Sequence, residues 1–203
     1  MILVVETATA ACSVALIDGG DLVDERHEVV GRGHAERLLP LVEDLLRGRQ
    51  PDSILVDVGP GSFTGLRVGL AAAQGLRIGW GVPLGGFSSM ALLALQAEDR
   101  AAVALAGGHG QLFVQSFSHD PLAPLDPLRS LPPEEAARVI RAPLVLGSGA
   151  AALVAARGFG EAVDALPRAA DARFLPASLA GLPPRPIYGR PPDAKPQGAE
   201  PAS

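Results

Sequence analysis

The sequence predicts an α/β fold built from two related halves, and three observations support this prediction. Short runs of β-branched and apolar residues alternate with segments in which apolar residues recur at helical spacing. The order of elements in residues 1–100 is strand, strand, strand, helix, strand, helix, helix, and a strand hairpin then begins again. Hydrophobic residues make up 48% of the 203 residues and charged residues only 19%, which is enough apolar side chain for a buried core. We therefore expect an N-terminal half over 1–100 and a reduced C-terminal half over 101–190.

The N-terminal half opens with three strands and an amphipathic helix. Residues 2–5 (ILVV) form one apolar run, and CSVALID and DLVDERHEVV form two more, joined by turn residues at 18–20. These runs predict an antiparallel meander. From His34 to Leu46 apolar residues fall at helical spacing, and Gly48 lies just beyond, where helices commonly end.

A glycine turn separates the next strand from the next helix. SILVDVG over 53–59 predicts a buried strand that ends in Gly-Pro-Gly, after which Ser62 or Thr64 can cap a helix running to about Gly79. A further helix is expected over 88–97, and AAVALAGG with QLFVQSF predicts a strand hairpin.

The C-terminal half is thinner and contains more proline. PLAPLDPLRSLPPEEA predicts a connection, EEAARVI a short helix, and PLVLGSGAAALVAA a strand, a glycine turn and a helix. Residues 191–203 are rich in proline and polar residues, so we expect a disordered tail there.

Composition excludes several classes of function. The formal net charge is -5 and no basic cluster occurs, so strong direct binding to nucleic acid is not expected. The single cysteine, Cys12, excludes a disulfide framework and a zinc site made of thiolates. The N-terminus lacks the features of a signal peptide, and nowhere do 18 apolar residues run uninterrupted, so a cytoplasmic location without membrane contact is expected.

The helix after the glycine turn carries an unusual number of glycines. Each glycine inside a helix costs about 1 kcal/mol relative to alanine, so a close approach must offset the cost. Small residues at 61, 65, 69 and 73 recur every four positions and form a smooth stripe where another backbone can come near. We expect this stripe to face a partner protein; the alternative is that it packs inside the chain against the sheet. The lysine of a phosphate-binding P-loop is missing, and the glycine spacing does not fit a dinucleotide fingerprint.

Acidic residues offer a rival function. Glu6 follows the first strand, Glu43 lies on the first helix and Asp57 ends the fourth strand, which are elements on which ribonuclease-H-like nucleases hold metal ions. No fourth acid appears at a suitable later position. The four histidines show no spacing that would place two imidazoles together on one helix face.

Three segments together resemble the TsaB (YeaZ) family: ETATAACSVALID, RGHAERLLPLVEDLL and, most specifically, GPGSFTGLRVGLAAAQGL. The resemblance is good over about residues 1–97 and continues weakly to the C-terminal PIYGR, where Gly189 replaces the family's leucine. It implies a fold of the actin, sugar-kinase and Hsp70 type with two ribonuclease-H-like halves. It also implies a role in making threonylcarbamoyladenosine beside the tRNA anticodon.

The resemblance implies an accessory subunit without catalytic activity of its own. TsaB pairs with its paralogue TsaD, which carries the transfer chemistry, and the ATPase TsaE joins them; TsaB alone is expected to form a homodimer. The alternative function is a metal-dependent nuclease or weak ATPase that uses the three acids above. The partner interface is expected to contain eight residues: Gly61, Gly65, Leu66, Gly69, Leu70, Ala73, Leu38 and Val42.

Two departures from catalytic relatives support this assignment. TsaD-like proteins bind metal through a histidine pair four residues apart, and the corresponding positions here are Ser89 and Leu93, which are poor metal ligands. ETAT at residues 6–9 replaces the phosphate loop of the related kinases. No cofactor is expected apart from a nucleotide at the interface with TsaD. The candidate nucleotide contacts are Thr7, Ser62, Thr64, Gly147 and Gly149.

Overall fold

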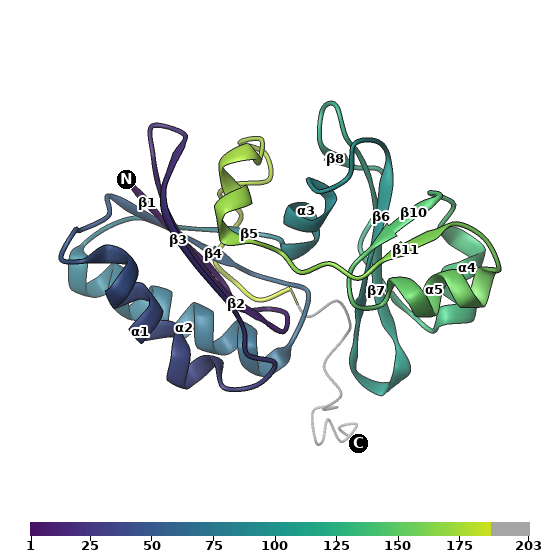
Figure 1. Cartoon of the computed structure of the whole chain (residues 1–203), viewed down its shortest axis with the longest axis horizontal. Coiled ribbons are helices and arrows are strands. Elements are labelled where there is room, and N and C mark those ends of the chain that lie inside the picture. Colours follow the sequence, from purple (N-terminus) through teal and green to yellow (C-terminus); the bar gives the residue numbers. More distant parts are fainter. Residues whose placement is uncertain (188–203) are drawn as a thin grey trace, which may run out of the picture.

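The computed structural model describes residues 1–187, which build two mixed β-sheets that lie beside one another (Figure 1). The first sheet has the strand order β3-β2-β1-β4-β5. Its strands are β1 (Ile2–Glu6), β2 (Ala11–Asp18), β3 (Asp21–Val29), β4 (Ser53–Asp57) and β5 (Leu84–Phe87). The predicted meander is confirmed, because β1, β2 and β3 pair antiparallel, and β4 and β5 then extend the sheet in parallel. The expected tail over 191–203 and the PIYGR ending from Tyr188 onward lie outside the described residues.

Two long helices cover one face of this first sheet. They are α1 (His34–Leu46) and α2 (Phe63–Trp80), and Figure 1 shows them side by side under the strands. Apolar side chains from alternate strand positions, such as Leu3 and Val5, pack against both helices. The predicted cap is confirmed at Ser62, whose hydroxyl oxygen accepts a hydrogen bond from the Gly65 N–H at the start of α2.

The opposite face of the first sheet is covered by α3 (Ser89–Ala94) and the 3-10 helix η2 (Ala169–Phe174). All six residues of α3 are buried. Their core includes Val4 from the first sheet and Val103 and Phe113 from the second, so α3 lies between the two halves (Figure 1). The halves therefore share one continuous apolar core.

The second sheet repeats the arrangement at smaller scale, with the strand order β11-β10-β6-β7-β8 and β9 paired to β7. Its strands are β6 (Ala101–Ala106), β7 (Leu112–Ser118), β8 (Ala123–Pro124), β9 (Arg129–Leu131), β10 (Leu144–Leu146) and β11 (Glu161–Val163). Helices α4 (Pro133–Val139) and α5 (Ala150–Arg157) cover its outer face. A one-turn helix, η1 (Gly108–Gly110), joins β6 to β7.

The chain returns to the first half after β11, which corrects a simple division at residue 100. The Ala169 N–H in η2 donates to the Ser13 hydroxyl oxygen on β2 at 3.0 Å. Further along, the Gly86 N–H on β5 donates to the Leu182 carbonyl at 2.7 Å, and the Ile187 N–H donates to the Val58 carbonyl at 2.7 Å. Residues 169–187 therefore belong structurally to the N-terminal half, although they follow the second sheet in sequence.

The glycine stripe of α2 packs inside the chain, against the loop that follows β1. A Cβ atom at Gly65 would collide with the Thr7 carbonyl oxygen, one at Gly69 with the Thr7 hydroxyl, and one at Gly61 with the Ala8 carbonyl. The Thr7 hydroxyl donates to the Gly65 carbonyl at 2.9 Å. This close approach offsets the cost of the glycines.

For the stripe at 61, 65, 69 and 73, the structure supports the alternative of internal packing and not the expected contact with a partner. Seven of the eight residues expected at the partner interface are buried, namely Gly65, Leu66, Gly69, Leu70, Ala73, Leu38 and Val42, and Gly61 is half-buried. The reason is geometrical: a four-residue repeat of small side chains allows any backbone to approach, and here the nearest backbone is the chain's own.

A pair of glycine substitutions tests this packing. Gly65→Ala should lower the free energy of unfolding by about 1 to 3 kcal/mol, because the new methyl group overpacks the Thr7 carbonyl. Gly75→Ala, where nothing lies within 4 Å, should instead stabilise the chain by about 0.5 to 1 kcal/mol through helix propensity. Thermal melts should move in opposite directions, by about 2 to 4 °C per kcal/mol. Equal melting temperatures for the two variants would contradict the assignment.

Candidate functional site

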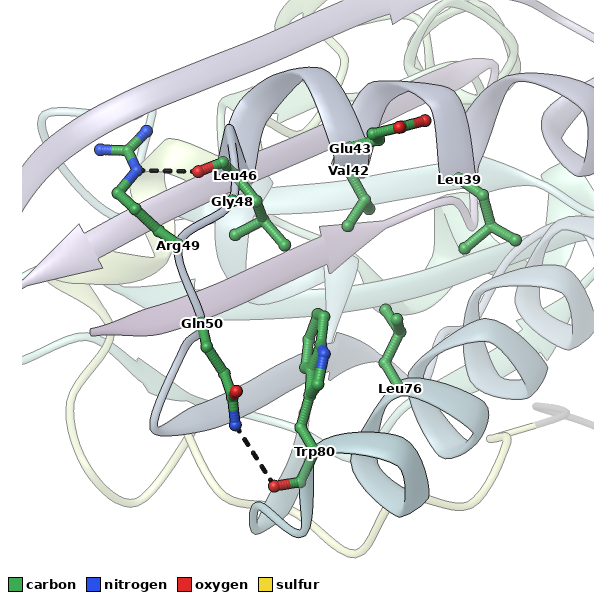
Figure 2. Close-up of a pocket in the computed structure, with 9 residues that line it drawn as sticks. All are labelled: Leu39, Val42, Glu43, Leu46, Gly48, Arg49, Gln50, Leu76 and Trp80. Carbon is green, nitrogen blue, oxygen red and sulfur yellow. Dashed lines mark hydrogen bonds between the residues drawn. The ribbon is translucent and has the colours of Figure 1, made fainter.

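A groove opens between the C-terminal parts of α1 and α2 (Figure 2). Its volume is about 450 Å³. Figure 2 shows Leu39, Val42 and Leu46 of α1 pointing toward Leu76 and Trp80 of α2. We call this feature the α1–α2 groove; Glu43, Gly48, Arg49 and Gln50 complete its lining.

The loop after α1, residues 48–50, lines part of the α1–α2 groove. The Arg49 guanidinium donates from Nε to the Leu46 carbonyl at 3.0 Å and from Nη2 to the Leu45 carbonyl at 2.8 Å. A cation on these last carbonyls also offsets the negative end of the helix dipole. The Gln50 amide donates to the Trp80 carbonyl at 3.4 Å, which links the ends of the two helices (Figure 2). The groove is therefore supported by backbone contacts at its base.

The outward side of α2 carries exposed small and apolar residues together with Arg67 and Arg77, and acidic residues are absent from this helix. We define the α2 outer face as Phe63, Thr64, Arg67, Ala71, Gly75 and Ile78, all of which are exposed. Ile78 is 79% exposed, and Leu39 on the neighbouring α1 is 51% exposed. The Arg67 guanidinium lies over the Phe63 ring at 3.7 Å. Exposed apolar side chains gathered over two adjacent helices indicate an interaction surface.

Two acidic side chains meet inside the first half. Glu6 ends β1 and Asp57 ends β4, and these strands pair in parallel with Val5 opposite Val56, so the two acids occupy the next register position. Both are fully buried. Burial raises the pKa of Glu6 well above its usual range, and the nearby Asp57 charge adds to this effect. Burial also raises the pKa of Asp57 above its usual range, while the N–H groups of Gly59 and Ser89 oppose this effect.

The third candidate metal-binding acid lies elsewhere. Glu43 is exposed on α1, where it lines the α1–α2 groove, while Glu6 and Asp57 are closed off in the core. Within residues 1–187 no cluster of three or more His, Cys, Asp or Glu side chains is placed to hold a metal ion. The prediction of a three-acid nuclease site is wrong, because strand-end acids and a helix-surface acid do not converge in this fold.

The ETAT segment at residues 6–9, compared above with the phosphate loop of the related kinases, packs against α2 of the same chain. Thr7 is fully buried and its hydroxyl is engaged with Gly65, while the Ser62 hydroxyl serves as the cap of α2 and Thr64 is exposed. In the second half, a Cβ atom at Gly147 would lie 2.6 Å from the Ala104 carbonyl oxygen.

Gly149 is closely packed as well, since its Cβ would lie 2.8 Å from the Leu112 side chain. The Ser148 hydroxyl between these glycines accepts a hydrogen bond from the Ala106 N–H at 3.1 Å. Nucleotide contact at these positions stays a prediction.

Ser89 has a structural role that the sequence did not indicate. Its N–H donates to Asp57 Oδ1 at 3.0 Å, and its hydroxyl donates to the Pro60 carbonyl at 3.1 Å. Leu93, the other position compared with the histidine pair of TsaD-like proteins, is fully buried in the core between the halves. In the sequence, the one indication of the acid pair is that Glu6 and Asp57 each end a predicted strand.

Sequence comparisons identify relatives over both halves. The family model described as "TsaD: tRNA N6-adenosine threonylcarbamoyltransferase" matches residues 27–120. The tRNA threonylcarbamoyladenosine biosynthesis protein TsaB of Escherichia coli (strain K12) is 36% identical over 131 residues, or 59% of this chain and 55% of that protein. An uncharacterized protein of Mycobacterium tuberculosis (strain ATCC 25618 / H37Rv) is 30% identical over 96% of this chain and 94% of its own length. The chain spans about half the length of the curated TsaB relatives that it matches.

A comparison of structures extends the likeness to nearly the whole chain. YeaZ from Pseudomonas aeruginosa superposes with a TM-score of 0.77 and 29% sequence identity, covering 92% of this chain and 99% of YeaZ. Within residues 1–187, no helix combines the length and the apolar character needed to span a membrane. The chain belongs to the TsaB/YeaZ family, and its two α/β halves have the fold of YeaZ.

Proposed function

We propose that this chain is a non-catalytic subunit that binds and activates TsaD during threonylcarbamoyl transfer to tRNA. The observation that carries the proposal is the similarity to relatives named for threonylcarbamoyladenosine biosynthesis. It is supported by an exposed apolar helix surface within the segment that matches the TsaD family model. TsaE joins the two proteins as the ATPase, and a nucleotide binds at the interface with TsaD rather than to this chain alone. The net charge of -5 supports a role in which TsaD, not this subunit, holds the tRNA.

The state of the reactive side chains supports the absence of catalytic activity. Glu6 and Asp57 are closed off from solvent, so neither can reach a substrate. The Cys12 thiol is buried on β2, and burial raises its pKa to about 11, which keeps it from acting as a nucleophile. Ser89 is buried with its hydroxyl engaged by Pro60.

We assign TsaD to the α2 outer face and the α1–α2 groove. The TsaD family model matches residues 27–120, a segment that includes both α1 and α2. A partner with related helices can meet them across an approximate two-fold axis, where the same elements of each chain pack together. Ile78 and Leu39 would then be covered by apolar side chains of TsaD, with Arg67 near the edge of the contact.

Substitution of Ile78 tests this surface. Ile78→Glu places a charge on a side chain that is 79% exposed, so the isolated chain should fold and melt as before, within about 0.5 kcal/mol. Binding to the cognate TsaD, measured by calorimetry, should weaken at least about tenfold because the charge must be desolvated in an apolar contact. Threonylcarbamoyladenosine formed in a reconstituted reaction should fall accordingly.

The matched control for this substitution is Val139→Glu. Val139 is a β-branched residue, 42% exposed, on α4 at the outer side of the other half. Val139→Glu should leave the affinity of the chain for TsaD unchanged. Weakened binding by Val139→Glu together with full binding by Ile78→Glu would place the interface on the C-terminal half and overturn the assignment.

The same surface should mediate self-association when TsaD is absent. An exposed apolar helix face tends to pair with a second copy of itself, and we expect a dimer in sedimentation velocity at tens of micromolar, on the order of ordinary weak interfaces. Ile78→Glu should convert this dimer to a monomer. A dimer that persists in this variant would show that another surface holds the two copies together.

A further inference from the structure

We propose that Glu6 and Asp57 share a single proton at neutral pH, and that this shared proton fastens the loops after β1 and β4 to the start of α3. The proposal does not depend on the proposed function. It rests on where the two carboxyl groups lie and on which of their oxygen atoms lack partners.

Each acid has one oxygen that is satisfied and one that is not. Glu6 Oε1 accepts from the Ala8 N–H at 2.9 Å, and Asp57 Oδ1 accepts from the N–H groups of Gly59 at 2.7 Å and Ser89 at 3.0 Å. Among the described residues, Glu6 Oε2 and Asp57 Oδ2 are buried without a hydrogen-bond partner. The parallel register of β1 and β4 puts the two side chains at neighbouring positions on the same face of the sheet. A proton between the two free oxygens satisfies both at once.

Within residues 1–187, no positive charge is placed to neutralise the pair. The described part of the chain has no ion pair between a basic side chain and either acid. The other titratable group that interacts with Glu6 is the Cys12 thiol on β2, which burial keeps neutral. Helix α3 carries no titratable side chain, and the arginines of α2, Arg67 and Arg77, are exposed. Two adjacent carboxylates buried without a cation cannot both stay ionised.

The hydrogen bonds decide which acid holds the proton. The charged form of Asp57 is stabilised by the N–H groups of Gly59 and Ser89 and by the Ser89 side chain. Glu6 accepts from the backbone at Ala8 and Thr9, but the neighbouring Asp57 charge raises the pKa of Glu6 further. The proton therefore resides on Glu6 Oε2, which donates to Asp57 Oδ2.

The pair ties together the segments that position α2. Through Ala8, Glu6 holds the loop whose carbonyl at Ala8 accepts from the Ser62 N–H at 2.6 Å. Asp57 holds the turn at Gly59, and Ser89 holds Pro60 in the same turn. Loss of the proton would leave two like charges at the junction of these loops.

The sign of the pH dependence follows from the proton count. In the unfolded chain both acids ionise near pH 4, while the folded chain keeps one proton at neutral pH. Because the folded state binds one more proton, the unfolding equilibrium constant should rise about tenfold per pH unit above about pH 5, until the pair loses its proton. The stability contributed by the pair is thus fully present at low pH and is lost as pH rises.

Glu6→Gln provides the test, because an amide N–H can donate to Asp57 without a titrating proton. Urea unfolding from about pH 5 to pH 7 should show a slope for the wild type that exceeds the slope for Glu6→Gln by one proton. Glu43→Gln, an exposed acid on α1, is the control and should behave as the wild type. Infrared spectra of the wild type at neutral pH should contain a protonated carboxyl C=O band that Glu6→Gln lacks and Glu43→Gln keeps.

Two results would overturn the proposal. One is a wild-type spectrum without a protonated carboxyl band at neutral pH, a measurement that stands even if Glu6→Gln does not fold. The other is stabilisation of the wild type, but not of Glu6→Gln, by added magnesium or calcium, which would mean that the two free oxygens bind a cation in place of a proton.

Discussion

The close approach of α2 to the loop after β1 is the constraint on which the rest of the N-terminal half depends. The small residues at 61, 65 and 69 allow the helix to lie directly against the backbone of Thr7 and Ala8. That contact sets the position of the turn at 59–61. Hydrogen bonds from Gly59 to Asp57 and from Ser89 to Pro60 hold this turn in place. Because the buried side of α2 packs against its own chain, the opposite side is the one that stays exposed.

The chain divides structural and interaction roles between two sides of the same helix. Its inner side packs against the loop after β1, where the Thr7 hydroxyl donates to the Gly65 carbonyl. Its outer side carries exposed apolar residues such as Ile78, beside the groove lined by Trp80 and Leu39.

The sequence predicted the elements whose pattern is long and local. The meander, α1 and α2 follow from periodicity and capping, and Ser62 was correctly expected at the start of α2. The strands β5, β8, β9 and β11 were missed because each has two to four residues, and β5 contains two glycines. Helix η2 was missed because its packing on β2 joins residues such as Ser13 and Ala169 that are far apart in sequence. The glycine stripe indicated a close approach but could not indicate which backbone approaches, and the acid pair depends on burial by α3, which no local pattern encodes.

The central claim is that one surface of α1 and α2 receives TsaD. Hydrogen exchange of the amide groups, measured on the isolated chain as a monomer and again in the presence of the cognate TsaD, tests it most directly. If TsaD binds this surface, added protection should be confined to residues 34–50 and 63–80, with exchange in α4 and α5 unchanged. Protection concentrated in the second half, or no change over α1 and α2 in a complex that has formed, would contradict it.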